Sequence, residues 1–220
     1  MRAWIIGLAV TLGACGGGGD SAPPPTPSVT ATNPRAAWMS LLTNTRTYSV
    51  AGTGSDGQQY GVSLTIAPGA GLTSSDGTAF PSATFTTRLA RNGAPLSSTF
   101  AEYAYEAGTG RVMFIVYGGG GCAALSASYQ LPASAGLGAS GPMFSGRHSP
   151  ACITLGAQAL TATWSFEADG ANGMLCVNQR REGLAVQSES WCVAVSAAGV
   201  PLSAARVSIS DGSGFSLTAR

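Results

Sequence analysis

Residues 60–66 read YGVSLTI, and their alternation decides the fold class. Every second residue is large and apolar, while the residues between them are glycine, serine or threonine. Because successive side chains of a strand point to opposite faces of a sheet, a period of two predicts a β-strand with one buried face.

The same alternation recurs along the chain, and turn residues separate one apolar run from the next. The turn signals are Ser55-Asp56-Gly57, Asn92-Gly93, Gly108-Thr109-Gly110 and Asp211-Gly212-Ser213-Gly214. Short turns of this kind join antiparallel neighbours. We expect strands at 46–53, 60–66, 83–90, 96–105, 111–117, 161–166, 174–180, 184–195, 200–209 and 215–219. Roughly ten to twelve such strands predict an all-β antiparallel meander, folded as a closed or half-open barrel or as a sandwich.

One short helix is predicted before these strands. Asn33 is a good helix cap and Pro34 is favoured at the first helical position, so the helix is expected to run from there to Leu42. Trp38, Leu41 and Leu42 form an apolar stripe at helical spacing. Because so short a helix is not stable alone, we expect this stripe to pack on the sheet or to plug one end of it.

Residues 131–151, LPASAGLGASGPMFSGRHSPA, are rich in glycine, proline and serine and are predicted to form a long loop rather than a strand. The only histidine, His148, lies in this segment. We expect it to be a solvated loop residue, because no acidic residue lies between Glu106 and Glu167 to orient it in a catalytic triad. A hydrolase that uses His148 with a partner distant in sequence is the less favoured alternative.

Two pairs of acidic residues are further candidates for chemistry. Glycosidases use two carboxylates that face each other, and Glu102 and Glu106 are such a pair, but their spacing favours side chains that face solvent. Glu167 and Asp169 precede a predicted turn and could bind calcium weakly, yet the ligands of an EF-hand loop are missing, so an ordinary turn is favoured. We therefore predict no catalytic residue, no metal site and no cofactor.

Aromatic residues gather in neighbouring predicted strands. An aromatic face could bind sugars or lipid chains, but in a chain so rich in glycine these side chains are more strongly expected to fill the core. They are Tyr103, Tyr105, Phe114, Tyr117, Trp164 and Trp191.

Four cysteines follow the N-terminal region, and an even number in an oxidising compartment favours disulfides. Proximity in sequence favours Cys122 with Cys152, and Cys176 with Cys192, although three pairings are open. The second pair flanks a predicted hairpin, so these two cysteines are expected to face each other on adjacent strands. A four-cysteine zinc site is disfavoured, because its usual closely spaced cysteine pairs are missing.

Composition excludes some classes of partner. The chain of 220 residues has 31 glycines, only 10% charged residues, and eleven basic residues that are all arginine, against ten acidic ones. A nearly neutral chain lacks the basic stripe that nucleic acids require and the polybasic patch that attracts a membrane surface. Residues 32–220 have the length of a single domain.

The N-terminal region predicts where in the cell the protein is located. An apolar run after Arg2 ends at Leu12-Gly13-Ala14-Cys15, which has the layout of a secretory signal over residues 1–14. Residues 15–31 are rich in glycine and proline and are expected to form a tether, which at full stretch spans on the order of 50 Å.

These first residues resemble Gram-negative, proteobacterial envelope lipoproteins. The resemblance implies cleavage before Cys15, lipidation of Cys15 and, because Gly16 rather than aspartate follows, anchoring in the outer membrane, facing the periplasm or the cell surface. Several acyl chains give stable attachment where one is marginal.

Together these features predict a lipid-anchored envelope protein that is not an enzyme and acts as a binding or structural module, with an envelope protein as partner. The alternative is a carrier or sensor of a hydrophobic ligand in a barrel cavity.

Overall fold

The computed structural model of this chain describes residues 29–149, 152, 158–182 and 187–220. The expected signal peptide, Cys15 and most of the expected tether lie outside the described residues, as does Leu184 at the start of a predicted strand. None of the helical segments in the described ranges is long and apolar enough to cross a membrane.

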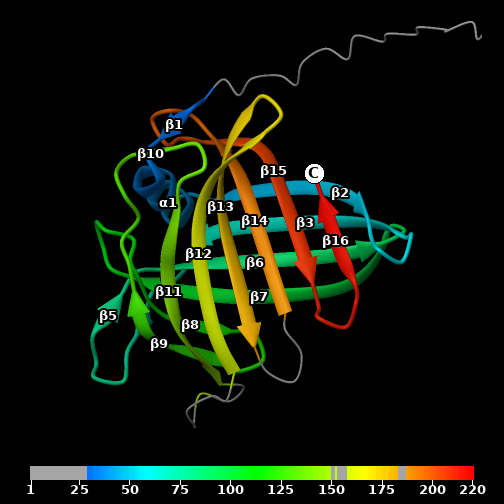
Figure 1. Cartoon of the computed structure of the whole chain (residues 1–220). Coiled ribbons are helices and arrows are strands. Elements are labelled where there is room, and N and C mark those ends of the chain that lie inside the picture. The colour runs from blue at the N-terminus through cyan, green and yellow to red at the C-terminus, as the bar shows by residue number, and fades with distance from the viewer. Residues whose placement is uncertain (1–28, 150–151, 153–157, 183–186) are drawn as a thin grey trace, which may run out of the picture.

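Twelve antiparallel strands form one sheet, and each strand pairs with its neighbours in the chain (Figure 1). In spatial order they are β2 (Arg46–Thr53), β3 (Gln59–Pro68), β6 (Ser82–Arg91), β7 (Ala94–Tyr105), β8 (Val112–Tyr117), β9 (Cys122–Ser128), β11 (Ser140–Ser149), β12 (Gln158–Asp169), β13 (Asn172–Glu182), β14 (Gln187–Val195), β15 (Pro201–Ser210) and β16 (Ser216–Ala219). This order confirms the predicted antiparallel meander and the hairpins at Asn92-Gly93 and Ser55-Asp56-Gly57.

The first and last strands of the sheet come together, so the sheet forms a nearly closed barrel. The backbone N–H of Ala51 donates to the carbonyl of Arg220 at 3.2 Å, and the N–H of Arg220 donates back to Ala51 at 3.1 Å. In Figure 1, β2, β3, β6 and β7 cross behind the front wall formed by β12 to β15. Side chains on alternate positions therefore point into a common lumen.

The helix and four short strands complete the described elements. The helix begins where the sequence predicts, because the side chain of Asn33 accepts a hydrogen bond from the N–H of Ala36 at 2.9 Å. The elements are α1 (Pro34–Thr43), β1 (Ala31–Thr32) paired with β10 (Ala135–Gly136), and β4 (Leu72–Thr73) paired with β5 (Ala79–Phe80).

Helix α1 plugs one end of the barrel (Figure 1), and its Trp38 is fully buried. The indole N–H of Trp38 donates to the carbonyl of Gly110 at 2.7 Å. Its ring stacks against Phe85 and Trp191, with ring centres 5.8 and 6.0 Å away. Tyr103 packs on Phe85 at 4.6 Å, so aromatic rings from the helix and three strands fill this end.

The prediction of a long loop over residues 131–151 was wrong for residues 140–149, because β11 occupies them and pairs with β9 and β12. Two glycines of β11 let neighbouring atoms approach the strand closely and do not form a turn. A Cβ at Gly141 would lie 2.9 Å from the Trp164 indole nitrogen, and one at Gly146 would lie 2.2 Å from the Ala124 carbonyl oxygen. Register shifts beside Pro142 and Gly146 accommodate residues that a regular strand disfavours.

Both predicted cysteine pairings are present: Cys122 with Cys152, and Cys176 with Cys192. The second pair faces across β13 and β14 in direct register, as the predicted hairpin requires.

Candidate functional site

The lumen changes character at the end opposite α1. There the inward side chains no longer meet, and a cavity of about 340 Å³ lies between β6, β7, β13, β14 and β15. This volume lies within the range of small-molecule pockets. Its lining residues are Thr87, Leu89, Ser97, Thr99, Gln179, Arg181, Gln187, Ser188, Glu189, Ile209, Ser210 and Asp211.

The period of two that places apolar side chains in the core also places polar side chains in the cavity lining. On β13, Leu175 and Val177 face the core, and Gln179 and Arg181 continue the same phase toward the open end. On β14, Trp191 points into the lumen, and Glu189, two residues before it, points inward as well. The sequence analysis missed these polar residues, although extending the period of two beyond the apolar positions would have found them.

A smaller recess of about 70 Å³ lies beneath the cavity, toward the aromatic core. The side-chain amide of Gln179 donates to the hydroxyl of Tyr103, whose pKa is raised well above its ordinary value by burial. Phe85 and Trp191 line the recess. The cavity and the recess share Thr87, Thr99, Gln179, Arg181 and Glu189. The two spaces thus form one site with polar walls above an aromatic floor.

Glu189 is the acidic group that lines both the cavity and the recess, whereas Asp211 lines the cavity alone and accepts hydrogen bonds from Ser213 in the turn after β15. Its carboxylate accepts a hydrogen bond from the hydroxyl of Thr87 at 3.1 Å. Burial in the lumen raises the pKa of Glu189, although the Thr87 hydrogen bond and the charge of Arg181 act in the opposite direction. The carboxyl therefore holds its proton more tightly than a glutamate in water.

Arg181 is the cationic group of the site. Its guanidinium carbon lies 5.4 Å from the centre of the Tyr117 ring, which is the geometry of a cation–π contact. Burial raises the pKa of Tyr117 to about 12, and its buried hydroxyl has no hydrogen-bond partner within the described chain. A positive charge and a neutral phenol therefore face the same space.

His148 lies beside this group and not in a solvated loop, so that expectation was wrong. It is on β11, with Nδ1 3.1 Å from the amide oxygen of Gln158 and its ring edge-on to Tyr117 at 4.9 Å. Burial, with the charge of Arg181, lowers the pKa of His148, which favours the neutral imidazole. An amide rather than a carboxylate contacts Nδ1, which is not the arrangement of a catalytic triad.

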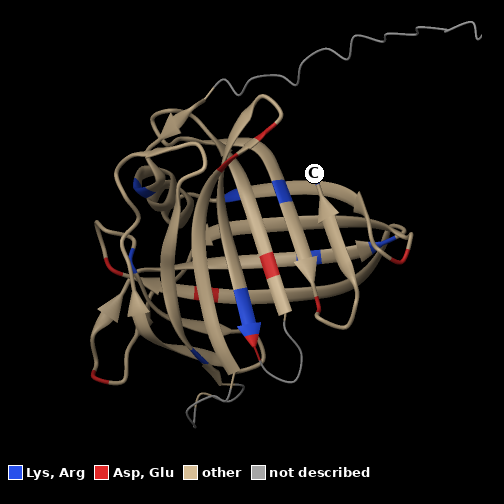
Figure 2. Ribbon diagram, viewed as in Figure 1, with Lys and Arg blue, Asp and Glu red and all other residues tan. Residues whose placement is uncertain are grey.

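The other acidic candidates lie outside the lumen. Glu102 accepts a hydrogen bond from the Ser82 hydroxyl at 2.5 Å, and Glu106 pairs with Arg111 at 3.2 Å in the turn before β8. Each carboxylate therefore has its own local partner. Charged side chains are sparse over the described wall and form no continuous basic band (Figure 2).

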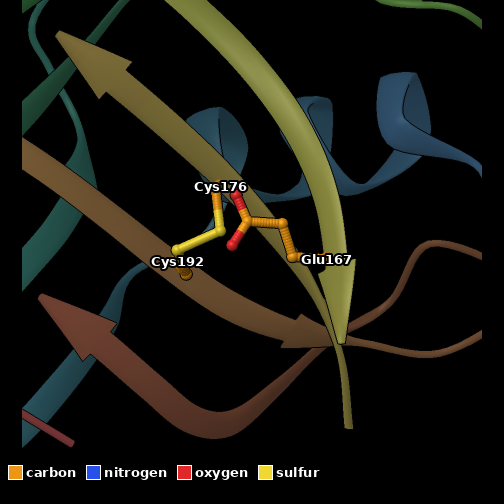
Figure 3. Close-up of side chains that lie close together, drawn as sticks. All are labelled: Glu167, Cys176 and Cys192. Atoms are coloured by element: carbon orange, nitrogen blue, oxygen red, sulfur yellow. A yellow bond between two sulfur atoms is a disulfide. The ribbon is translucent and has the colours of Figure 1, made fainter. Parts of the chain in front are cut away.

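Glu167 and Asp169 lie at the end of β12 and bind an arginine side chain rather than a metal ion. Arg206 contacts Glu167 at 2.6 Å and Asp169 at 3.3 Å on the outer face. Figure 3 shows Glu167 directed at the buried disulfide between Cys176 and Cys192. Although these three residues are close enough to hold a metal ion, the sulfurs are bonded to each other and Arg206 already neutralises the carboxylate. This cluster is a structural element of the outer wall.

The predicted core role of the aromatics is confirmed for Tyr103, Tyr105, Trp164 and Trp191. Phe114 instead packs outside the barrel against Phe80, at 6.0 Å between ring centres. Tyr117 faces the polar part of the lumen, as described above.

Comparison of the chain with protein-family models, curated proteins and solved structures gives no match.

Proposed function

We propose that this chain is a lipid-anchored envelope protein, not an enzyme, whose barrel binds a small ligand in the luminal cavity at its open end. The observation that carries the proposal is the cavity of about 340 Å³, placed where the aromatic core ends and the inward residues become polar. Cavities of this size with a few convergent polar groups are typical ligand sites.

The fixed arrangement of the polar side chains supports binding over catalysis. The polar groups of the lumen are held by neighbouring side chains: Gln179 binds Tyr103, Thr87 binds Glu189, and Gln158 binds His148. A rigid, prearranged lining suits recognition, since it lowers the ordering cost of binding.

The hydrophobic-ligand alternative is the second candidate, and the placement of the apolar side chains bears on it. Trp38, Phe85 and Trp191 occupy the apolar part of the lumen themselves. The remaining space is lined by one arginine, two carboxyl groups and two side-chain amides, which a purely apolar chain would leave unpaired. A ligand with a polar or charged group is therefore favoured over a bare acyl chain.

A substitution that fills the cavity tests luminal binding. Thr99→Trp on β7 places a large ring in the cavity, whereas the matched Ser98→Trp points to the outer face of the same strand. We expect native mass spectrometry of the purified protein to show a co-purifying small molecule in the parent chain and in Ser98→Trp, and not in Thr99→Trp. Equal ligand content in all three would contradict the proposal.

The anchoring part is tested separately at Cys15. We expect Cys15→Ala to move the protein from the membrane fraction to the soluble fraction, because attachment depends on the lipid. Retention of the variant in the membrane would contradict a lipid anchor and leave the luminal proposal unaffected.

A further inference from the structure

Two arginines of the barrel have contrasting partners. On the outer wall, Arg206 is 17% exposed at its side chain and pairs with Glu167 and Asp169. In the lumen, the direct partner of Arg181 among the described residues is the ring of Tyr117. The ring attracts the cation, but it accepts none of the five N–H bonds that the guanidinium can donate.

The buried acid of the lumen, Glu189, forms no ion pair with Arg181 within the described ranges. Glu189 lies on the neighbouring strand, where it pairs in register with Gln179, and Thr87 donates to its carboxylate. No ion pair within 4.0 Å joins Glu189 to Arg181 in the described structure, where five other ion pairs are present. A cation that is partly removed from water without a counterion is costly unless a ligand supplies one.

We propose that the luminal cavity binds a small organic anion whose charged oxygens pair with Arg181 and whose apolar part lies against Leu89 and Ile209. The inference rests on the proposed luminal function and names its ligand class. A planar guanidinium matches the two oxygens of a carboxylate or of a phosphate group, so both anions share the required chemistry. Leu89 and Ile209 are the apolar residues of the cavity wall, on β6 and β15.

The test measures binding of four amphiphiles of equal chain length to the purified full-length protein by isothermal titration calorimetry. Hexanoate and hexyl phosphate are the two anions, and hexanol and hexylammonium are their neutral and cationic counterparts. We expect the anions to bind at least about tenfold more tightly than the other two, because a charge-assisted hydrogen bond is worth about one to two powers of ten in affinity. Preference for hexanoate identifies a carboxylate site and preference for hexyl phosphate a phosphate site, and either supports the inference.

The matched variants are Arg181→Gln and Arg180→Gln. Arg180 precedes Arg181 on β13 but lies on the outer face, where it pairs with Glu182 and its side chain is 57% exposed. We expect Arg181→Gln to weaken hexanoate or hexyl phosphate binding at least about tenfold, with Arg180→Gln unchanged. Arg181→Lys keeps the charge but loses the planar guanidinium, so its affinity for the anion is expected to lie between those of Arg181→Gln and Arg180→Gln.

The outcomes separate this inference from the proposed function. Equal binding of all four amphiphiles, or unchanged affinity in Arg181→Gln, overturns the anion site, while loss of binding in Thr99→Trp would still support a luminal pocket. Binding of none of the four also overturns it, and the co-purification comparison described above then decides the luminal function independently.

Discussion

Strand β7 contributes to both ends of the barrel, and its two halves differ in burial. Tyr103 and Tyr105 near its C-terminal end are 2% and 6% exposed, whereas every residue from Ala94 to Phe100 is exposed. Strand β6 pairs with β7 along both halves, whereas β8 pairs only with the half from Ala101 to Tyr105. The difference in burial therefore comes both from what fills the lumen and from the missing second neighbour of the exposed half.

At the helix end, α1 and four aromatic rings supply the apolar contacts that hold the barrel together. At the open end, short polar side chains such as Thr87 and Thr99 leave space between the walls. The proposed function therefore places stability and ligand binding at different ends of one sheet. Four pairs of substitutions test this division.

The largest effect is expected at the centre of the helix end. Trp38→Ala removes a fully buried ring that stacks on Phe85 and Trp191 and donates to Gly110. We expect it to lower the free energy of unfolding by about 3–5 kcal/mol, measured by urea denaturation. Leu96→Ala, in the exposed half of β7, is the control and is expected to change it by less than about 0.5 kcal/mol. Similar losses in both variants would contradict the division.

A second pair compares two glycines of one turn. Gly110 and Gly108 have φ values of +69° and +81°, so alanine is strained at both. A Cβ at Gly110 would also lie 2.8 Å from the Trp38 ring and from the Met39 sulfur, whereas one at Gly108 meets nothing within 4 Å. We expect Gly110→Ala to cost about 1–3 kcal/mol more than Gly108→Ala in urea denaturation. Equal costs would show that the helix is loosely held.

The two ends also differ in how far the sequence predicts them. The helix end follows from local signals: the Asn33 cap, the stripe around Trp38 and the alternation in residues 60–66 all agree. The open end depends on which polar residues of distant strands share the lumen. Thr87 and Glu189 form a hydrogen bond only because the sheet closes, and the sequence predicts a closed barrel no more strongly than a half-open barrel or a sandwich.

The misassigned strand β11 has a related cause. Its glycines and proline predict a loop from local propensity, yet Gly141 and Gly146 are required by the Trp164 ring and by the backbone of β9. Tertiary contacts therefore override the local preference. The position of His148 in the lumen follows from this strand and was missed with it.

At the open end, Thr87→Val is expected to have a modest effect. It preserves the shape of the side chain and removes the hydrogen bond to Glu189. We expect a loss of about 1 kcal/mol in the free energy of unfolding, together with a further rise in the pKa of Glu189, because the Thr87 bond now lowers it. Thr86→Val, whose side chain faces away from the lumen, is the control for the change of residue type. A loss of several kcal/mol at Thr87 would place the open end within the stabilising core.

The smallest effect is expected at Glu189, and it has the opposite sign. The folded barrel raises the pKa of Glu189 above its ordinary value of 4.5, so the unfolded chain releases this proton more readily. Below pH 4.5 the carboxyl is mostly protonated in both the folded and the unfolded chain, so it does not lower the free energy of unfolding. As the pH rises above 4.5 and through the raised pKa, the free energy of unfolding falls. Glu189→Gln removes this fall, so the variant is expected to be more stable than the parent at neutral pH and similar to it at pH 4.

The measurement is urea denaturation between pH 4 and pH 8, read as the difference between variant and parent. Taking the difference cancels the other groups that titrate in this range, His148 among them. Glu182→Gln serves as the control, because its exposed carboxylate pairs with Arg180 on the outer face and is 55% exposed. A variant that is less stable than the parent at neutral pH would mean that the Glu189 charge stabilises the empty barrel, and that its partner in the lumen is Arg181 and not a ligand. If Glu189→Gln is instead more stable than the parent and still binds the anion, the Glu189 carboxyl lowers the stability of the barrel while it keeps the cavity polar. Such a loss of stability is expected at a binding site.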